Sequence, residues 1–429
     1  MAMRISIIAL LSLVTLTAQN SDLTPRELAM AKVAWRYFEN NYQPATGLVN
    51  AAEGFPSTTM WDAASSVGAL VAAQQLGIVT REQFDERLGK LLQTLNTFPL
   101  FHDELPNKAY DTRTATKTGY DNSPGEIGYS AIDIGRLLVM LKIVKTHYPA
   151  YANAIDRAVL RWSFCHCVDA CGTLQGARLE ADKSVKYVQE GRLGYEEYAA
   201  SGYRLWGFDT TRASKVEPVA FADIYGVQLP YDARDPRTLG QHNYVVSEPF
   251  VLQGIELNLS YADPRFKEFA DRVYRAQELR FTRTGVLTAR TEHHLDRAPY
   301  FVYDTIYSDG YPWNTITGDG TYQPALAAVA TKGAIGLWTL WHTPYTARLF
   351  AAVAGNFDEH KGFYEGIYEN GSGPIRAFTA NNNGVILECL LYKKQGTLLP
   401  AAAAPASESA RSLWDEKRPS CARATCGGS

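Results

Sequence analysis

Two alternating kinds of helical segment constrain the fold of this chain more than any other feature. One kind is apolar or small on all sides, which is typical of a helix buried by its neighbours. Segments of this kind begin near residues 61, 130, 194, 247, 324 and 382. Partner segments, mostly amphipathic, cover residues 24–42, 80–95, 150–162, 264–281 and 344–355. Residues 209–240 are too irregular to place a further partner.

This alternation predicts an all-α fold, an (α/α)6 toroid with six inner and six outer helices. The loops that lead from an outer to an inner helix are long, at residues 43–57, 98–129, 282–322 and 356–381. They would emerge around the N-termini of the inner helices and wall a single cleft. Helix N-termini also favour ionised carboxylates there. An irregular helical protein without a closed ring is the alternative.

The two ends of the chain differ from the middle. Residues 1–19 hold Arg4, an apolar run and Ala18 before a polar stretch, which predicts a secretory signal peptide. An uncleaved anchor is the alternative. We expect residues 20–398 to form one soluble domain and residues 399–429, rich in Ala, Pro and Ser, to be a disordered tail. The protein would then be periplasmic or secreted, with no stable membrane insertion.

The cysteines fit export. Cys165, Cys167 and Cys171 lie close together, which predicts a local disulfide in an oxidising compartment. No second Cys or His pair completes a zinc spacing, so we expect no metal and no cofactor. Calcium at an Asp-Gly turn is a weaker alternative. Cys389 lies in an apolar run and is expected to be an inert core residue.

Aromatic side chains and carboxylates gather in one stretch, residues 287–315. The chain has 25 tyrosines and 8 tryptophans, and this stretch interleaves several of them with acids and histidines. Aromatic rings stack on sugar C–H faces, and acids bind sugar hydroxyls. A formal net charge of −3 gives no reason to expect nucleic acid as a partner. The stretch therefore predicts a polysaccharide or oligosaccharide site.

Glycoside hydrolysis needs two carboxyl groups, one protonated and one ionised. We expect Glu292 to be one of them and Glu126 or Glu196 to be the other. The predicted substrate-binding residues are Trp61, Asp62, Asp133, Arg136, Tyr195, Glu248, Tyr303, Asp304 and Trp313, with Tyr195, Tyr303 and Trp313 stacking on sugars. Structural alternatives are a helix cap for Asp62, a local ion pair between Asp133 and Arg136, and a helix-dipole charge for Glu248.

Two other functions stay open. The run of His242, Asn243 and Tyr244 fits a polysaccharide lyase, which abstracts a proton beside a uronate carboxylate. A lyase also needs basic residues for its anionic substrate, and this chain is slightly acidic. A non-catalytic glycan-binding protein would keep the aromatic rings without placing two acids across a bound sugar.

Several strings together carry a resemblance over residues 24–398. They are GFPSTTMWDAASSVGAL, PLFHDELPNKAYDTRT, IGYSAIDIGRLLVMLKIVKTHYP, RLGYEEYAASGYRLWG, TEHHLDRAPYFVYDTI, TPYT and NNNGVILECLLYKKQG. They resemble an uncharacterised bacterial family catalogued as a domain of unknown function. That family is distantly similar to glycoamylase-like (α/α)6 proteins, which include β-1,2-glucanases and the processing domain of cyclic β-glucan synthases. The resemblance implies the toroid and a β-glucan-like substrate for a glycoside hydrolase or transglycosylase.

Overall fold

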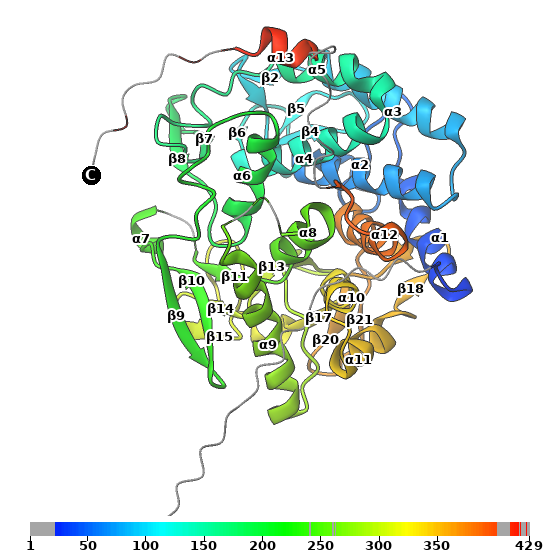
Figure 1. Cartoon of the computed structure of the whole chain (residues 1–429), viewed down its shortest axis with the longest axis vertical. Coiled ribbons are helices and arrows are strands. Elements are labelled where there is room, and N and C mark those ends of the chain that lie inside the picture. Colours follow the sequence, from blue (N-terminus) through cyan, green and yellow to red (C-terminus); the bar gives the residue numbers. More distant parts are fainter. Residues whose placement is uncertain are drawn as a thin grey trace, which may run out of the picture.

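Six buried helices form the centre of the molecule. The computed structural model describes residues 22–239, 242–259, 261, 263–400, 412–419, 421 and 426, so the predicted signal peptide lies outside the described residues. The inner helices are α2 (Met60–Gln75), α4 (Ala131–His147), α6 (Tyr195–Leu205), α8 (Glu248–Leu257), α10 (Thr331–Leu340) and α12 (Ala380–Gln395). Each contacts the next in this order, and α12 contacts α2, so the contacts run in a cycle (Figure 1).

Small residues allow the inner helices to approach closely. A Cβ atom on Gly202 of α6 would lie 2.0 Å from the carbonyl oxygen of Gly135 on α4. Only glycine fits such a backbone contact, which explains the small composition of these segments. The helix expected from residue 324 begins at Thr331 instead, since a 3-10 turn (Pro324–Leu326) and strand β17 (Ala328–Ala330) precede it.

Five amphipathic helices lie outside this ring: α1 (Pro25–Asn40), α3 (Arg81–Leu95), α5 (Ala152–Leu160), α9 (Phe266–Thr284) and α11 (Pro344–Val353). Capping boxes begin three of them, because Thr24, Thr80 and Thr343 accept hydrogen bonds from the backbone N–H groups of Glu27, Gln83 and Thr346. The buried faces point to the inner helices, and the charged faces point to solvent.

The predicted sixth outer helix is absent from the described residues. Between α6 and α8 lie an antiparallel hairpin, β9 (Val219–Ile224) and β10 (Val227–Asp232), and the short α7 (Pro236–Leu239). Tyr225 and Gly226 form its two-residue turn with φ of 56° and 87°, the geometry of a tight hairpin. The hairpin packs on α9 at the edge of the molecule (Figure 1).

Short antiparallel strands occupy the long loops, so the prediction of an all-α fold was incomplete. They pair in seven groups: β1 (Ser57–Thr59), β4 (Ala109–Asp111) and β5 (Lys117–Thr118); β2 (Leu100–Phe101) and β3 (Leu105–Pro106); β6 (Gly128–Tyr129), β7 (Gln175–Leu179) and β8 (Val185–Gln189); β11 (Tyr244–Val245), β14 (Tyr307–Ser308) and β15 (Tyr311–Pro312); β12 (His293–His294), β13 (Phe301–Asp304) and β16 (Thr315–Ile316); β17, β20 (Gly366–Tyr368) and β21 (Pro374–Ile375); β18 (Phe357–Asp358) and β19 (Gly362–Phe363). The aromatic stretch 287–315 is thus built of strands β12 to β16.

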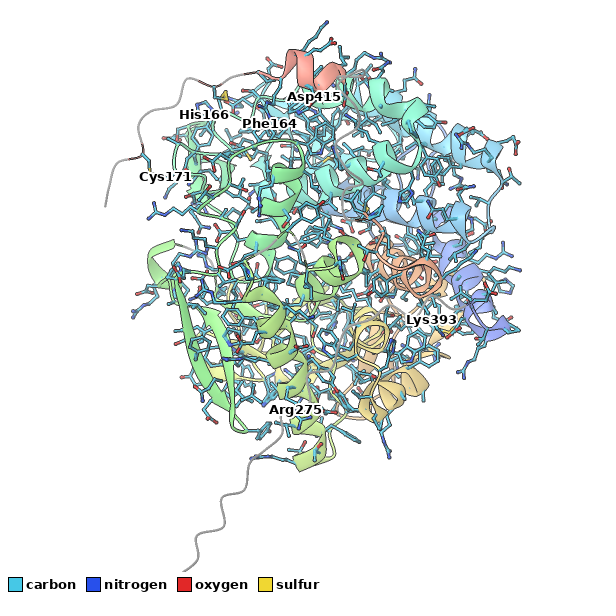
Figure 2. The ribbon with its side chains drawn as sticks, in the orientation of Figure 1. Phe164, His166, Cys171, Arg275, Lys393 and Asp415 are labelled. Carbon is cyan, nitrogen blue, oxygen red and sulfur yellow. A yellow bond between two sulfur atoms is a disulfide. The ribbon has the colours of Figure 1, made fainter. Side chains whose placement is uncertain are left out.

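The C-terminal segment differs from the prediction of a disordered tail. Residues Leu413–Lys417 form helix α13, which lies on α5 (Figure 1). Trp414 is buried there, with its ring centre 6.4 Å from that of Phe164. Figure 2 shows Phe164 close to Asp415, the next residue of this helix. A helix of five residues is too short to show a periodic pattern of apolar residues, so the sequence did not predict α13.

The disulfides are long-range rather than local. Cys165 is bonded to Cys421 and Cys171 to Cys426, which ties the C-terminal segment to the turn before β7. Cys167 stays a buried free thiol, and Cys389 is a buried free thiol in α12, as expected. Within the described part of the chain, none of the helices has the length and apolar character needed to cross a bilayer.

Candidate active site

Polar caps fix the starts of three inner helices. The side-chain hydroxyl of the residue before each helix accepts a hydrogen bond of 3.1 Å from a backbone N–H in its first turn, in the pairs Thr59 and Asp62, Ser130 and Asp133, and Thr379 and Asn382. This arrangement places a carboxylate or amide at the helix start. The cap of α2 is therefore Thr59, whose hydroxyl also donates to Asp62 Oδ2 at 2.7 Å. Burial raises the pKa of Asp62, although Thr59, Arg136 and Lys332 act in the opposite direction.

Glu248, the first residue of α8, is a carboxylate with several hydrogen-bond and ion-pair partners. Its Oε1 accepts from Asn381 Nδ2 at 2.8 Å, Trp61 Nε1 at 3.3 Å and Arg136 Nη1 at 3.5 Å. Its Oε2 is ion-paired with Lys332 Nζ. Burial raises the pKa of Glu248, but Lys332 and Arg136 outweigh it and hold the pKa below the ordinary value. Glu248 is therefore ionised at neutral pH.

Glu292 lies beside Glu248 and has the opposite character. The hydroxyl of Tyr195 donates to its Oε1, Thr291 Oγ1 donates to its Oε2 at 2.8 Å, and Lys332 Nζ is 3.8 Å from Oε1. Burial and the neighbouring charge of Glu248 raise its pKa to about 7. Two carboxyl groups in contact seldom ionise together, so this pair holds one proton near neutral pH.

Lys332 lies between the two carboxyl groups and is not among the site residues predicted from the sequence. It is 3% exposed in the first turn of α10. Burial lowers the pKa of Lys332, but the charges of Glu248, Glu292 and Glu365 raise it by more. The pKa is therefore above its ordinary value, and the amine stays charged. The available signal was a lone charge in an otherwise apolar helix, since such a charge is costly unless it is paired.

Arg136 of α4 is fully buried and contacts Glu248 of the carboxyl pair. Its guanidinium is 4.5 Å from the centre of the Trp61 ring and donates to Asn381 Oδ1 at 2.9 Å. It also pairs with Glu388 at 3.4 Å. The local ion pair with Asp133 does not form, because Arg136 points into the ring toward α8 and α12.

Aromatic rings continue from the carboxyl pair. Trp61 and Tyr195 meet edge to face with ring centres 5.3 Å apart, and Tyr195 meets Tyr244 at 6.2 Å. Tyr244 then stacks on Tyr303 at 4.4 Å. Burial and the charge of Glu292 raise the pKa of the Tyr303 phenol to about 12.

A second pair of carboxyl groups lies at the start of α4. Burial and the nearby Glu190 raise the pKa of Asp133 to about 7. Glu190 accepts a hydrogen bond of 2.6 Å from the N–H of Ala131, and burial raises its pKa as well. Asp133, Glu190 and Glu292 all raise the pKa of Tyr303, so that phenol lies near both carboxyl pairs. Tyr120 also lies near this pair, because burial and the charges of Asp133 and Glu190 raise the pKa of its phenol.

The two other predicted catalytic acids have different partners. Glu126 pairs with Lys117 and with His102 at 3.3 Å, and these partners hold its pKa below the ordinary value although burial raises it. Glu196 lies in the first turn of α6, where Arg234 pairs with it at 2.5 Å, and burial raises its pKa to about 6. The side chains that these acids contact belong to other clusters than that of Glu248 and Glu292.

Asp304 and Trp313 also make structural contacts. Asp304 is fully buried, pairs with Arg290 at 2.9 Å and accepts from the N–H of Ala328 at 2.7 Å. Trp313 lies under the guanidinium of Arg280, 4.6 Å from its ring centre. These contacts hold strands β13 and β16 in place.

The run of residues that fits a lyase is separated in space. His242 Nδ1 is 2.6 Å from Asp309 Oδ2, and Asn243 Oδ1 accepts from Arg192 Nε at 3.0 Å. Of the three, Tyr244 reaches the ring cluster. In the described residues no group of His, Cys, Asp and Glu side chains is arranged to hold a metal ion.

The family follows from the sequence match. A family model described as "Protein of unknown function (DUF3131)" matches residues 29–396. The chain belongs to this family. Among curated proteins, none matches the DUF3131 chain.

Solved structures share the fold of this DUF3131 chain at low identity. An endo-β-1,2-glucanase from Chitinophaga pinensis, solved with sophorotriose and glucose, has a TM-score of 0.63 and 15% identity, over 88% of this chain and 94% of that one. A candidate glucoamylase from Bacteroides caccae has a TM-score of 0.64 and 13% identity, over 87% and 94%. An endo-β-1,2-glucanase from Talaromyces funiculosus, solved with sophorose, has a TM-score of 0.57 and 12% identity, over 87% and 84%. The similarity to glycoamylase-like proteins and β-1,2-glucanases, predicted from the sequence, is confirmed at the level of the fold.

Proposed function

We propose that this protein is an exported glycoside hydrolase or transglycosylase acting on a bacterial β-glucan, and that its ring of helices is the inner layer of an (α/α)6 toroid. One observation carries the proposal: Glu248 and Glu292 lie in contact with their pKa values moved in opposite directions. The ionised Glu248 thus helps to keep a proton on Glu292, and a carboxyl group that is protonated near neutral pH is what acid-assisted cleavage of a glycosidic bond needs.

Glu292 is the proton donor in this proposal. Its pKa of about 7 keeps a substantial fraction of Glu292 protonated near neutral pH, and it gives this proton to the glycosidic oxygen as the bond breaks. The carboxylate left behind is stabilised by Lys332 Nζ at 3.8 Å and by the hydroxyl groups of Tyr195 and Thr291. Glu248 is a positioning residue, because it acts through Glu292 rather than on the sugar.

Asp133 is the second carboxyl, in place of Glu126 or Glu196. It is half-buried, and like Glu292 it lies close enough to Tyr303 to raise the pKa of that phenol. In its ionised form Asp133 takes the proton of the attacking water, or of an acceptor hydroxyl in transglycosylation. Burial and the nearby Glu190 both raise the pKa of Asp133.

The sugar is bound by aromatic rings. Trp61, Tyr195, Tyr244 and Tyr303 form a row beside the carboxyl pairs. Neutral ring-lined sites suit an uncharged glucan, and two of the similar solved structures are named as β-1,2-glucanases. A β-1,2-glucan is therefore the first substrate to test.

Export is proposed from the disulfides. Two of them join the domain to the C-terminal segment. Disulfides persist in oxidising compartments, so the periplasm or the exterior is the proposed location.

Product analysis tests the function. Protein beginning at residue 20 would be incubated with β-1,2-, β-1,3- and β-1,6-glucans and with uronate polymers, beside the variants Glu292→Gln, Asp133→Asn and Glu126→Gln. We expect oligosaccharides from a neutral glucan, lost in the first two variants and retained in the third. Cleavage that persists in Glu292→Gln removes this residue from the mechanism. Ultraviolet-absorbing products from uronates support a lyase, and glycan retention without cleavage supports a binding protein.

A further inference from the structure

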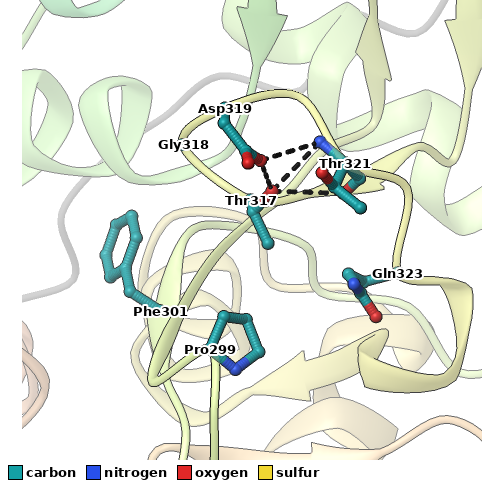
Figure 3. A pocket seen from close by; sticks show the side chains of 7 residues that line it. All are labelled: Pro299, Phe301, Thr317, Gly318, Asp319, Thr321 and Gln323. Atoms are coloured by element: carbon teal, nitrogen blue, oxygen red, sulfur yellow. Dashed lines mark hydrogen bonds between the residues drawn. The ribbon is translucent and has the colours of Figure 1, made fainter.

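A cavity of about 420 Å³ lies beyond the far end of the aromatic row. It is lined by Pro299, Phe301, Thr317, Gly318, Asp319, Thr321 and Gln323 (Figure 3). Pro299 and Phe301 give it an apolar wall on the turn before β13 and on β13 itself. The other residues come from the turn after β16 and give it a polar wall. Its volume lies in the range of small-molecule sites.

The cavity is continuous with the proposed active site through β13. Phe301 and Tyr303 lie two residues apart on this strand, so they share one face and are about 7 Å apart along it. Their rings meet edge to face with centres 5.1 Å apart. Because Tyr303 stacks on Tyr244, an unbroken series of rings leads from Trp61 and the carboxyl pair to Phe301.

His294 is a second link between the cavity and the proposed active site, because it lies near both Phe301 and Lys332. Its ring centre is 5.3 Å from that of Phe301. Burial and the charge of Lys332 lower its pKa to about 4, so the imidazole is neutral at physiological pH. A neutral imidazole offers one hydrogen-bond donor and one acceptor, which suits sugar hydroxyls.

The polar wall is held in shape before any ligand arrives. The N–H of Thr321 donates to Thr317 Oγ1 at 3.0 Å and to Asp319 Oδ1 at 3.1 Å (Figure 3). Hydrogen bonds from this turn lower the pKa of Asp319, so its exposed carboxylate is ionised. Among the described residues the carboxamide of Gln323 makes no hydrogen bond, which leaves its donors and acceptor available.

We propose that this cavity is a distal sugar subsite, in which a hexose of the same glucan chain stacks on Phe301 and is bound by Asp319 and Gln323. The proposal rests on the proposed function, because the ring series is taken as the path of the substrate. It adds that the enzyme prefers oligosaccharides long enough to reach from the carboxyl pair to Phe301. Shorter substrates are cleaved without this contact.

The test compares substrates of different length. Cleavage rates on a ladder of β-1,2-glucooligosaccharides would be measured for the wild type, Phe301→Ala, Gln323→Ala and Tyr311→Ala. Tyr311 is the matched control, because its ring is 68% exposed on β15 and does not line the cavity. We expect kcat/KM of the first two variants to fall about tenfold on long oligosaccharides, the order of one lost ring or hydrogen-bond contact, and to stay unchanged on short ones. The control should behave as the wild type.

Two outcomes overturn the subsite. Equal losses on short and long substrates in both variants would mean a structural role for these side chains, and no loss on long substrates would mean that the chain does not reach the cavity. Binding of the same ladder, followed by tryptophan fluorescence, separates this failure from failure of the proposed function. Length-dependent binding that is weakened in Phe301→Ala supports the subsite even if no glucan is cleaved, whereas absence of both binding and cleavage refutes both proposals.

Discussion

Replacing Glu292 by Gln should abolish activity and stabilise the fold at alkaline pH. The pKa of Glu292 is about 7 in the folded protein against an ordinary value of 4.5. A carboxyl with a raised pKa holds its proton more tightly when folded, so it destabilises the fold as the pH rises above 4.5. This loss is complete above pH 7. At about 1.4 kcal/mol per pH unit, ionised Glu292 costs the fold about 3 kcal/mol.

The Gln side chain matches the protonated acid and never ionises. The variant should therefore gain stability over the wild type as the pH is raised from 5 to 9. An unfolding entropy of about 2.1 cal/mol/K per residue gives about 0.8 kcal/mol/K for this domain, so the gain corresponds to about 4 °C in Tm. A lost hydrogen bond to Tyr195 or Thr291 would change the Tm of the variant by the same amount at every pH. The part of the Tm difference that varies with pH therefore reports the ionisation of Glu292.

The assay is thermal unfolding of both proteins at several pH values, with glucan cleavage measured in parallel. Glu126→Gln is the matched control, because the pKa of Glu126 is lowered by Lys117 and His102 although burial raises it. A carboxyl group with a lowered pKa in the folded protein stabilises the fold at pH values above its unfolded pKa. The Glu126→Gln variant should therefore lose a little stability at neutral pH and keep its activity. A Tm difference between Glu292→Gln and the wild type that is constant with pH, or that favours the wild type at pH 9, would refute the reasoning.

Three further predictions follow from the same contacts. Lys332→Met removes the cation that Glu248 and Glu292 share, which leaves Glu248 with Arg136 alone, and should lower the free energy of unfolding by about 3–5 kcal/mol in urea titrations; Lys361→Met, which breaks a half-exposed pair, is the control and should change it by less than about 1 kcal/mol. Asp133→Asn should remove the acidic limb of the pH profile of kcat/KM, because the ionised form is needed and its pKa is about 7; an acidic limb that persists in the residual activity would contradict this role. Replacing Cys165 and Cys421 together by Ser should lower stability by about 3 kcal/mol and expose the C-terminal segment to proteases, whereas an unchanged Tm and digestion pattern would show that this disulfide adds nothing.

Local patterns in the sequence were sufficient to predict the six inner helices and five outer helices, but not the short α13 or the start of α10. The inner helices are apolar on all sides because protein surrounds them, and helix starts such as Thr24 and Thr80 are encoded within four residues. The importance of the stretch around Glu292 was also visible, since it combines acids with rings that no ordinary loop needs. Both kinds of signal depend on neighbours in the chain, so they survive without knowledge of the fold.

Only the tertiary structure decided which side chains act together. Glu248, Glu292 and Lys332 lie on separate segments, and their contact depends on how α8 and α10 meet strand β12. The same holds for the pair of Glu196 with Arg234 and for the disulfides to Cys421 and Cys426. The two cysteines of each disulfide are more than 250 residues apart in the chain. A charge acquires its pKa from burial and from neighbours across the ring, and neither is written in the local sequence.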